Sequence, residues 1–249
     1  MVSKTTDMPL PRILPAGDMA LVVEFGDAID PAINARTLAF DAAIAAAAES
    51  GALSGIVETV PTYRSVLVHY DPLVIGFEAL SNALSGLSAG DRAAEPGRLW
   101  TVPTVFGGEH GIDLEFVATT IGARPSEVID LFLSAEYRVY MIGFAPGFAY
   151  LGGSPERLHL PRRPEPRARV PAGTVSVGGM QAAINSMEMP SGWHLLGRTP
   201  ARVFDLRRDP PFLFRPGDRI RFTSVEDATF RRLARDAEAG AYMPACSLS

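Results

Sequence analysis

The sequence has 249 residues, of which 47% are hydrophobic and 20% charged, with a formal net charge of -5 at pH 7. This composition is typical of a globular chain with one large or two ordinary domains, and the absence of a basic excess argues against a general nucleic-acid binder. The single Cys246 cannot form an intrachain disulfide, no apolar run has the ~18 residues of a membrane span, and the N-terminus lacks signal-peptide order, so we expect a soluble, cytoplasmic protein with no membrane partner.

After a loose leader at residues 1–10, the first part of the chain alternates strand and helix patterns. Extended segments are predicted at residues 13–14, 20–25, 56–60 and 66–70. Asp30-Pro31 is a helix start, because the carboxylate can accept from the first amides and proline is tolerated in the first turn. That helix runs to Glu49, and a second carries its apolar residues at helical spacing between residues 77 and 87. The order predicts an α+β sandwich of ferredoxin-like type over residues 10–95.

A small, polar stretch at residues 88–97, S-A-G-D-R-A-A-E-P-G, is the predicted linker. It divides the chain into an N-terminal domain with its linker, residues 1–95, and a second domain, residues 96–249.

The second part combines short strands with a few helices. A strand is predicted at 99–106, and Asp113 is placed to cap a short helix that runs through Ile121 and ends at Gly122. A helix from about Pro125, strands at 202–206 and 220–222, and a last helix at 226–239 preceded by a capping-box spacing complete the pattern. Many short strands with regular turns predict a small β-barrel or sandwich.

The segment from 140 to 200 is rich in glycine, proline, aromatic residues and arginine. Gly and Pro favour tight turns there, and aromatic walls with guanidinium donors suit a small anionic or amide-bearing ligand. Arg167 and Arg169 alternate on a strand, so they share one face and form a carboxylate clamp, part of a protein interface or a solvated pair. Phe144 and Phe148 are either core residues or the wall of a pocket, and Arg198 either fixes a turn or binds a ligand.

Most catalytic signatures are absent from the sequence. It has no G-x-x-x-x-G-K-[ST] loop, no G-x-S-x-G elbow, no H-E-x-x-H and no Cys or His pair at metal-ligand spacing. We therefore expect no metal and no cofactor on this chain alone. His194, next to Trp193, is the candidate acid or base near neutral pH, although the sequence pairs no carboxylate or nucleophile with it.

Several long motifs resemble those of the allophanate hydrolase subunit 1 family. They are G-F-A-P-G-F-A-Y-L-G-G at 143–153, the pattern P-R-x-x-V-P-A-G-[ST]-V at 166–175, G-W-x-L-L-G-R-T-P at 192–200 and P-G-D-x-[IV]-R-F at 216–222. Shorter matches at 106–108, 113–118 and 127–129 fall in the same order. The family includes the B subunits of bacterial 5-oxoprolinases and the sporulation-kinase inhibitor KipI.

The resemblance implies a ferredoxin-like N-terminal domain followed by a cyclophilin-like β-barrel domain. It also implies an allophanate hydrolase subunit 2-like partner (the C subunit), a LamB/YcsF-type A subunit, and a hydrolase that cleaves an amide or lactam bond only when assembled. In 5-oxoprolinase the complex uses ATP to open 5-oxoproline to glutamate, whereas related domains in urea amidolyases accompany a biotin-dependent carboxylase. A KipI-like regulator that inhibits a histidine kinase through its N-terminal domain is the alternative, and a prolyl isomerase is suggested by the barrel fold alone.

One segment departs from the family pattern. Relatives commonly carry Q-T-G-I-Y-P where this chain has Gln181 followed by A-A-I-N-S at 182–186, and a histidine often found in the second helix is Phe132 here. A different ligand or reduced activity would follow if those positions contact substrate.

The predicted site residues all act on an amide or lactam carbonyl without serving as nucleophiles. His194 and Arg198 are the catalytic candidates, and the predicted substrate-binding residues are Phe144, Phe148, Arg167, Arg169, Gln181 and Trp193.

Overall fold

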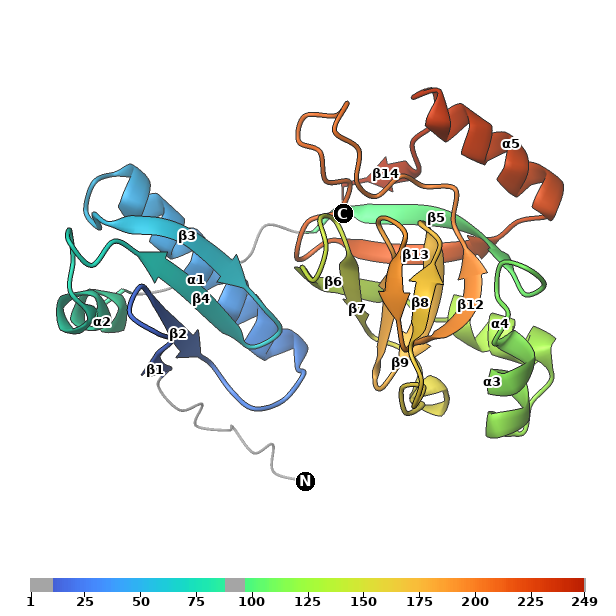
Figure 1. Cartoon of the computed structure of the whole chain (residues 1–249), viewed down its shortest axis with the longest axis horizontal. Coiled ribbons are helices and arrows are strands. Elements are labelled where there is room, and N and C mark those ends of the chain that lie inside the picture. The colour runs from blue at the N-terminus through green and yellow to red at the C-terminus, as the bar shows by residue number, and fades with distance from the viewer. Residues whose placement is uncertain (1–10, 88–96, 249) are drawn as a thin grey trace. The chain divides into compact units, whose positions relative to one another are not determined.

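The computed structural model describes residues 11–87 and 97–248, and the chain divides into two compact units, Met1–Glu95 and Pro96–Ser249 (Figure 1). The predicted leader at 1–10 and all of the predicted linker except Gly97 lie outside the described residues. None of the helices in the described ranges combines the length and apolar character needed to cross a bilayer.

The first unit is a four-stranded antiparallel sheet with two helices. Its strands lie in the order β1-β2-β4-β3, and their bounds are β1 Arg12–Pro15, β2 Ala20–Glu24, β3 Ile56–Pro61 and β4 Ser65–Tyr70. The helices are α1 (Pro31–Glu49) and α2 (Phe77–Ser85). As predicted, Asp30 is the N-cap of α1, and its Oδ1 accepts hydrogen bonds from the amides of Ala32 (2.8 Å) and Ile33 (3.0 Å).

One face of this sheet is apolar and carries both helices. Alternate residues of β2 and β4 are buried, and they pack with Phe40 and Ile44 of α1 and with Leu80 and Leu84 of α2. Because side chains of a strand alternate between the two faces, this pattern fixes the side on which the helices lie. The unit is therefore a two-layer α+β arrangement.

The second unit is a closed β-barrel. The sheet runs β12-β9-β10-β7-β6-β13-β5, β12 also pairs with β5, and β14 joins the remaining part of β5. The first strands are β5 Leu99–Phe106, β6 Tyr137–Ile142, β7 Ala149–Gly152, β9 Thr174–Gly178 and β10 Gln181–Ile184. They are followed by β12 His194–Arg198, β13 Arg219–Ser224 and β14 Ala245–Ser247.

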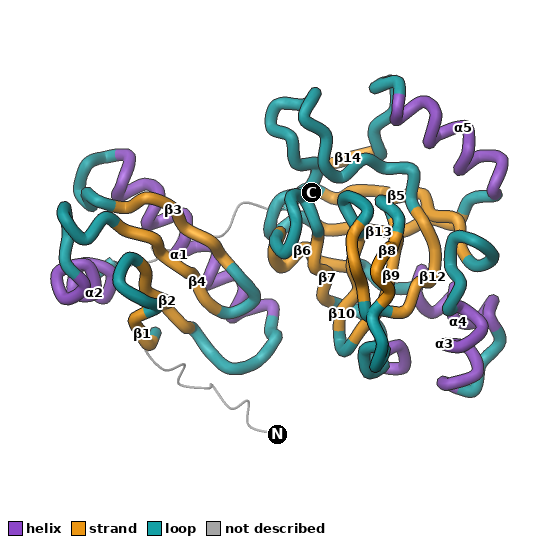
Figure 2. The backbone as a smooth tube through the Cα atoms, in the orientation of Figure 1, coloured by secondary structure: helices purple, strands orange, loops and turns teal. Residues whose placement is uncertain are grey.

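Two helices contribute to the barrel core and a third packs outside it. Helices α3 (Leu114–Ile121) and α4 (Pro125–Leu133) add Val117, Val128 and Phe132 to the central apolar cluster. Figure 2 shows α3 and α4 grouped near β12, with α5 (Asp227–Glu238) apart from them. The α+β class and the barrel are as the sequence predicts.

A small ribbon covers the outside of the barrel. It consists of β8 (Arg167–Val170) and β11 (Met189–Ser191), paired antiparallel. Beneath it, Met189 packs with Ala183 of β10 and with Phe148 and Trp193 in a separate apolar cluster. A single turn of 3-10 helix, Glu156–Leu158, precedes the ribbon.

Three local predictions are wrong. Residues 202–206 form no strand beyond an isolated bridge between Phe204 and Phe212, because Asp205 turns the chain by accepting the amide of Arg207 at 3.0 Å. The last helix forms, but Glu226 is its N-cap and makes no side-chain cap bond, so the expected capping box is absent. Asp113 occupies the predicted N-cap position of α3, but its side chain makes no cap hydrogen bond.

Candidate functional site

Two cavities lie at opposite ends of the β8–β11 ribbon. The first, the aromatic cavity, has a volume of about 420 Å³ and is lined by Phe144, Phe148, Tyr150, Arg162, Arg163, Pro164, Pro166, Pro190, Ser191, Gly192 and Trp193. The second, the arginine cavity, has about 500 Å³. Its lining comprises Ala172, Gly173, Ser186, Met187, Glu188, Arg198, Thr199, Pro200, Ala201, Arg202, Phe204, Phe230, Ala234 and Glu238. The predicted site residues are divided between these two places and their surroundings.

The aromatic cavity is built from rings in edge-to-face contact. The Phe148 centroid lies 5.7 Å from that of Phe144, 4.7 Å from that of Tyr150 and 6.5 Å from that of Trp193. The Arg162 guanidinium lies 5.3 Å from the Trp193 ring centroid, a cation–π arrangement. Burial raises the pKa of the Tyr150 phenol, with Arg162 opposing the shift, so Tyr150 is a neutral donor at physiological pH. These walls suit the apolar face of a small ring together with one polar group.

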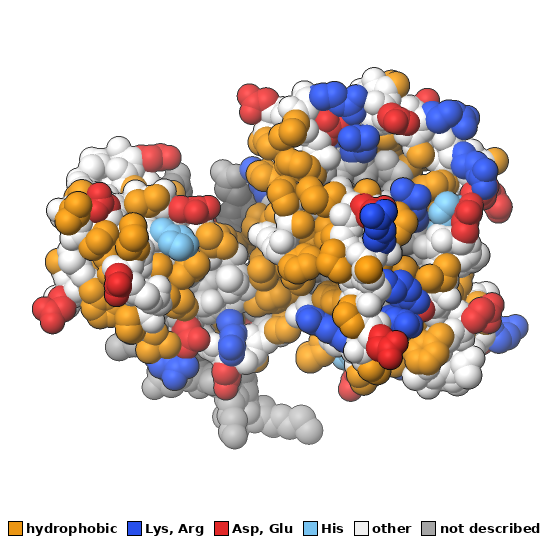
Figure 3. Space-filling model, in the orientation of Figure 1, with side chains coloured by type: hydrophobic (Ala, Val, Ile, Leu, Met, Phe, Trp, Pro, Cys, Tyr) orange, Lys and Arg blue, Asp and Glu red, His pale blue; other side chains and the backbone are white. Residues whose placement is uncertain are grey.

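Phe144 stands at the mouth of this cavity in a strained conformation. It lies between β6 and β7, its φ is 68°, and 70% of its surface is exposed. A bulky residue rarely adopts a positive φ, and the nearby Gly147 (φ 74°) is needed because a Cβ there would lie 2.8 Å from Cβ of Phe204. Figure 3 shows hydrophobic side chains gathered on this part of the barrel surface, around β6 and β7. The loop therefore presents an aromatic ring to solvent instead of burying it.

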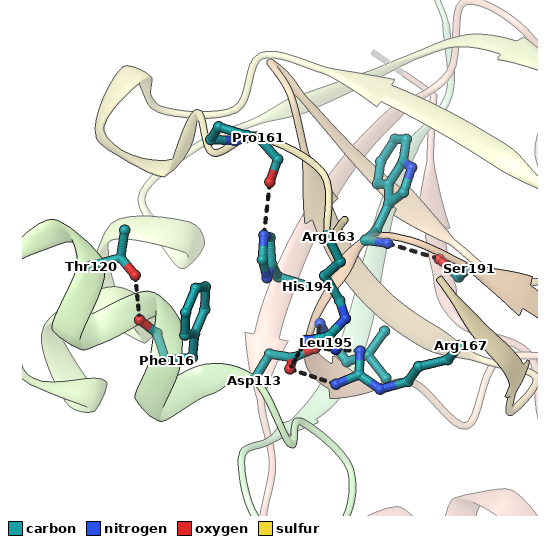
Figure 4. A network of polar contacts seen from close by, with 10 residues as sticks. Asp113, Phe116, Thr120, Pro161, Arg163, Arg167, Ser191, His194 and Leu195 are labelled. Carbon is teal, nitrogen blue, oxygen red and sulfur yellow. Dashed lines mark hydrogen bonds and ion pairs between the residues drawn. The ribbon is translucent and has the colours of Figure 1, made fainter. Parts of the chain in front are cut away.

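Asp113 is the centre of a polar network below the aromatic cavity (Figure 4). Arg167 donates two hydrogen bonds to its carboxylate, at 2.9 and 2.7 Å, and Arg163 donates a longer one at 3.4 Å. The amide of Leu195 in β12 donates a fourth at 2.8 Å. Because these four hydrogen bonds occupy the carboxylate, the Asp113 side chain does not cap α3. Both terminal nitrogens of Arg167 therefore bind the carboxylate of Asp113, and this ion pair links the ribbon to the barrel.

The other two polar candidates near the ribbon lie apart from Arg167. Arg169 is exposed and pairs with Glu188 at 3.7 Å, so the two arginines of β8 bind different carboxylates instead of converging on one anion. Gln181 begins β10 at its hairpin with β9, and its Oε1 is buried without a partner among the described residues.

His194 faces helix α3 instead of the aromatic cavity. Its Nε2 lies 2.9 Å from the carbonyl oxygen of Pro161, and its ring stacks on Phe116 with the centroids 5.2 Å apart (Figure 4). Trp193 lies before β12 and lines the aromatic cavity, whereas His194 opens β12 and stacks on Phe116, so the two residues do not line the same cavity. The carbonyl partner places the proton on Nε2, which leaves a buried Nδ1 without a partner in the described residues.

Arg198 belongs to the arginine cavity. Its Nε donates to the carbonyl oxygen of Ala172 at 2.8 Å, which is the turn-fixing role that the sequence suggests. Its guanidinium carbon lies 5.8 Å from the ring centroid of Phe230 in α5. Burial lowers the pKa of Arg198, and attraction to Glu109 partly offsets this.

One group of side chains in the described ranges has the spacing of metal ligands. The ligand atoms of Glu109, His110 and Asp227 lie within 4.8 Å of one another. However, Arg231 donates to Asp227 at 2.6 Å and to Glu109 at 3.2 Å, and His110 bonds Asp227 at 3.0 Å. A cation would have to displace Arg231, so we interpret the group as an ion-pair network that holds α5 to the loop after β5.

This network predicts an acid-sensitive contribution to stability. The hydrogen bond with His110 is the main cause that lowers the pKa of Asp227, with Arg231 adding to it against the effect of burial. A carboxylate whose pKa is lowered in the folded state stabilises that state above its unfolded pKa of about 3.9 and loses the contribution as the pH falls through the folded value. We therefore expect the stability gap between the wild type and Asp227→Asn to shrink from pH 5 to pH 3.

Urea unfolding followed by tryptophan fluorescence measures this gap, with Asp236→Asn as a control for removing another charge from α5. A gap that stays constant over that pH range contradicts the assignment.

Sequence reasoning missed Asp113 as an organising residue and missed Arg162, Arg163 and Ser186 as cavity residues. The basic run at 162–169 was the available signal for the two arginines. Nothing local marks Asp113, because its partners lie 50, 54 and 82 residues away in the sequence.

Comparison with known proteins places the chain in a family. The model of the carboxyltransferase domain, subdomain C and D, matches residues 11–214. The B subunit of 5-oxoprolinase from Bacillus subtilis (strain 168) is 35% identical over 230 residues, which are 86% of this chain and 92% of that protein. The B subunit of 5-oxoprolinase from Escherichia coli O157:H7 is 38% identical over 176 residues, 70% of this chain and 81% of that protein.

A solved structure agrees with these matches. The protein TTHA0988 is 36% identical with a TM-score of 0.73, and the likeness covers 83% of this chain but only 40% of that longer one. The chain therefore belongs to the carboxyltransferase C and D subdomain family, within the group formed by allophanate hydrolase subunit 1 and the B subunits of 5-oxoprolinases.

Proposed function

We propose that this chain is the B subunit of a heteromeric, ATP-dependent hydrolase that opens 5-oxoproline to glutamate. The observation that carries the proposal is the match to proteins named as B subunits of 5-oxoprolinase over 92% and 81% of their lengths. A subunit 2-like C protein and a LamB/YcsF-type A protein are the partners, and the assembled complex consumes the ATP. The bond cleaved is the lactam C–N bond, and the chain is active only with its partners.

The same proposal assigns the two units as domains. Residues 1–95 are a ferredoxin-like domain and its linker, and residues 96–249 a cyclophilin-like barrel. The β-α-β-β-α order from β2 to α2 supports the first assignment, with β1 at the edge where the last ferredoxin-like strand would lie. The closed barrel with helices at its side supports the second.

Within this chain, the aromatic cavity is the place proposed for the lactam. Phe144, Phe148 and Trp193 supply apolar walls for the ring, and Arg162 is an exposed guanidinium beside them. A donor fixed next to a carbonyl stabilises the negative charge that develops on its oxygen during hydrolysis. Under this proposal His194 and Arg167 position β12 and the ribbon, whereas Arg198 serves a separate cavity.

Reconstitution tests the proposal directly. The purified chain with its C and A partners should release glutamate from 5-oxoproline only in the presence of ATP, and omission of any one of the three proteins should abolish release. A complete complex that turns over no 5-oxoproline would overturn it.

Truncation of Phe144 should affect substrate binding without unfolding the chain. Because the ring is 70% exposed, we expect Phe144→Ala to leave stability nearly unchanged while raising the KM of the complex about 3- to 10-fold through lost ring contact. Steady-state kinetics measure this, with Phe212→Ala, another exposed aromatic residue, as the matched control. An unchanged KM would remove the aromatic cavity from the proposal.

A further inference from the structure

The arginine cavity contains a cation that the protein itself does not neutralise. Within residues 11–87 and 97–248, the one hydrogen bond of the Arg198 side chain is from Nε to the carbonyl oxygen of Ala172, and no carboxylate forms an ion pair with it. Both terminal nitrogens are therefore free to donate. A partly buried guanidinium without an acidic partner costs folding free energy, so its retention needs another explanation.

The position of this guanidinium is fixed from two sides. On one side, Nε of Arg198 donates its hydrogen bond to the carbonyl oxygen of Ala172. On the other side, the ring centroid of Phe230 lies 5.8 Å from the guanidinium carbon, and the His110 ring packs on Phe230 with the centroids 4.7 Å apart. Attraction to Glu109 acts on it only at longer range. A donor held in this way loses little side-chain freedom when it binds a ligand.

Further polar groups without partners lie at this end of the barrel, and one of them lines the cavity. In the barrel register Arg198 is opposite Thr174, whose carbonyl oxygen accepts the amide of Asn185. Asn185 is 1% exposed, and neither its amide nitrogen nor its amide oxygen has a partner in the described residues. The next residue, Ser186, lines the cavity with an equally unpartnered hydroxyl. Buried polar groups of native proteins are normally satisfied, so this cluster is suited to a bound polar molecule.

The remaining charges around the cavity indicate which anion fits. Arg202 pairs with Asp205 at 3.2 Å and Glu188 with Arg169 at 3.7 Å, and Glu238 is an exposed residue of the lining. One unpaired guanidinium balances a singly charged ligand, whereas a doubly charged phosphate would leave excess negative charge beside Glu238. The flat fork of arginine also matches a carboxylate in two parallel hydrogen bonds.

We propose that the arginine cavity is a binding site for a small carboxylic acid, with Arg198 holding the carboxylate and Ser186 donating a further hydrogen bond. The site lies at the other end of the β8–β11 ribbon from the aromatic cavity and needs no partner protein.

Titration calorimetry on the full chain alone tests the site. The probes are 5-oxoproline and glutamate, which carry a carboxylate, 2-pyrrolidinone, which has the same lactam ring without one, and inorganic phosphate. We expect both carboxylates to bind at this site at least about tenfold more tightly than 2-pyrrolidinone or phosphate, as the loss of a charge-assisted pair implies.

Variants separate a binding role from a structural one. Arg198→Gln should weaken carboxylate binding about tenfold or more, and Ser186→Ala, which leaves the bond to Ala172 intact, about two- to fivefold. The matched control Arg232→Gln removes a cation that is already paired with Asp236 and lies outside the cavity lining, so it should leave affinity unchanged.

Equal binding by wild type and both Arg198→Gln and Ser186→Ala overturns the site, as does tighter binding of phosphate than of carboxylates. These outcomes are independent of turnover by the assembled complex, so a failure here leaves the hydrolase proposal standing, and the reverse also holds.

Discussion

Replacement of Asp113 by alanine is expected to lower the free energy of unfolding of the barrel unit by about 3–5 kcal/mol, the usual cost of removing one partner of a buried ion pair. The Asp113 side chain is only 5% exposed, and it accepts hydrogen bonds from Arg167, Arg163 and the amide of Leu195. Its removal leaves two partly buried guanidinium groups and one buried amide without their acceptor. Asp113→Asn keeps the shape and one acceptor oxygen, so a smaller loss is expected.

Both tryptophans, Trp100 and Trp193, lie in the unit Pro96–Ser249, so fluorescence during urea unfolding reports on this unit. The matched control is Arg169→Gln on the same ribbon, because that arginine is 83% exposed and 3.7 Å from an exposed glutamate. Its loss should cost less than about 0.5 kcal/mol. If Asp113→Ala costs no more than this control, the carboxylate does not organise the ribbon.

The same substitution links stability to the proposed function. Arg163 lines the aromatic cavity directly, and Arg167 holds the ribbon strand that follows the lining residue Pro166. Without Asp113 the wall formed by these residues loses its anchor, so Asp113→Asn should raise the KM of the assembled hydrolase more than it lowers kcat.

Local sequence signals were sufficient for most elements. Asp30-Pro31 starts α1 because the cap depends only on the next few amides, and Gly122 ends α3 because its φ of 64° favours glycine. The strand at 99–106 was also predicted at its observed bounds. In these cases the deciding interactions lie within a few residues of each other.

Long-range competition decided the predictions that failed. Asp113 has the residue type and place of an N-cap, yet two arginines more than 49 residues away take its carboxylate. Trp193 and His194 were assigned to one site because they are adjacent, but Trp193 lies before β12 and lines the aromatic cavity, while His194 opens that strand and stacks on Phe116. The division of the candidate residues between two cavities follows from the β8–β11 ribbon, whose pairing no local pattern indicates.

Truncation of Phe132 should be comparably costly, because this ring joins helix α4 to the strands of the barrel. Its side chain is fully buried, with ring centroids 4.9 Å from Tyr137, 4.9 Å from Phe222 and 5.8 Å from Phe106. The Tyr137 hydroxyl also donates to the Phe132 carbonyl at 3.0 Å, and burial raises the pKa of that phenol. Phe132→Ala should therefore destabilise the barrel unit by about 3–5 kcal/mol through lost transfer free energy and a cavity.

The comparison with an exposed apolar residue separates packing from hydrophobicity alone. Leu206 is 82% exposed, and Leu206→Ala should change the free energy of unfolding by less than about 0.5 kcal/mol. A loss below about 1.5 kcal/mol for Phe132→Ala would mean that α4 collapses into the space, and loss of the near-ultraviolet circular dichroism of the three neighbouring rings would report that movement. If Phe132→Ala lowers the free energy of unfolding by the full amount and the spectrum is unchanged, the strands stay in place and the cavity stays open. This is the result expected from the close packing of β5, β13 and α4 around Phe132.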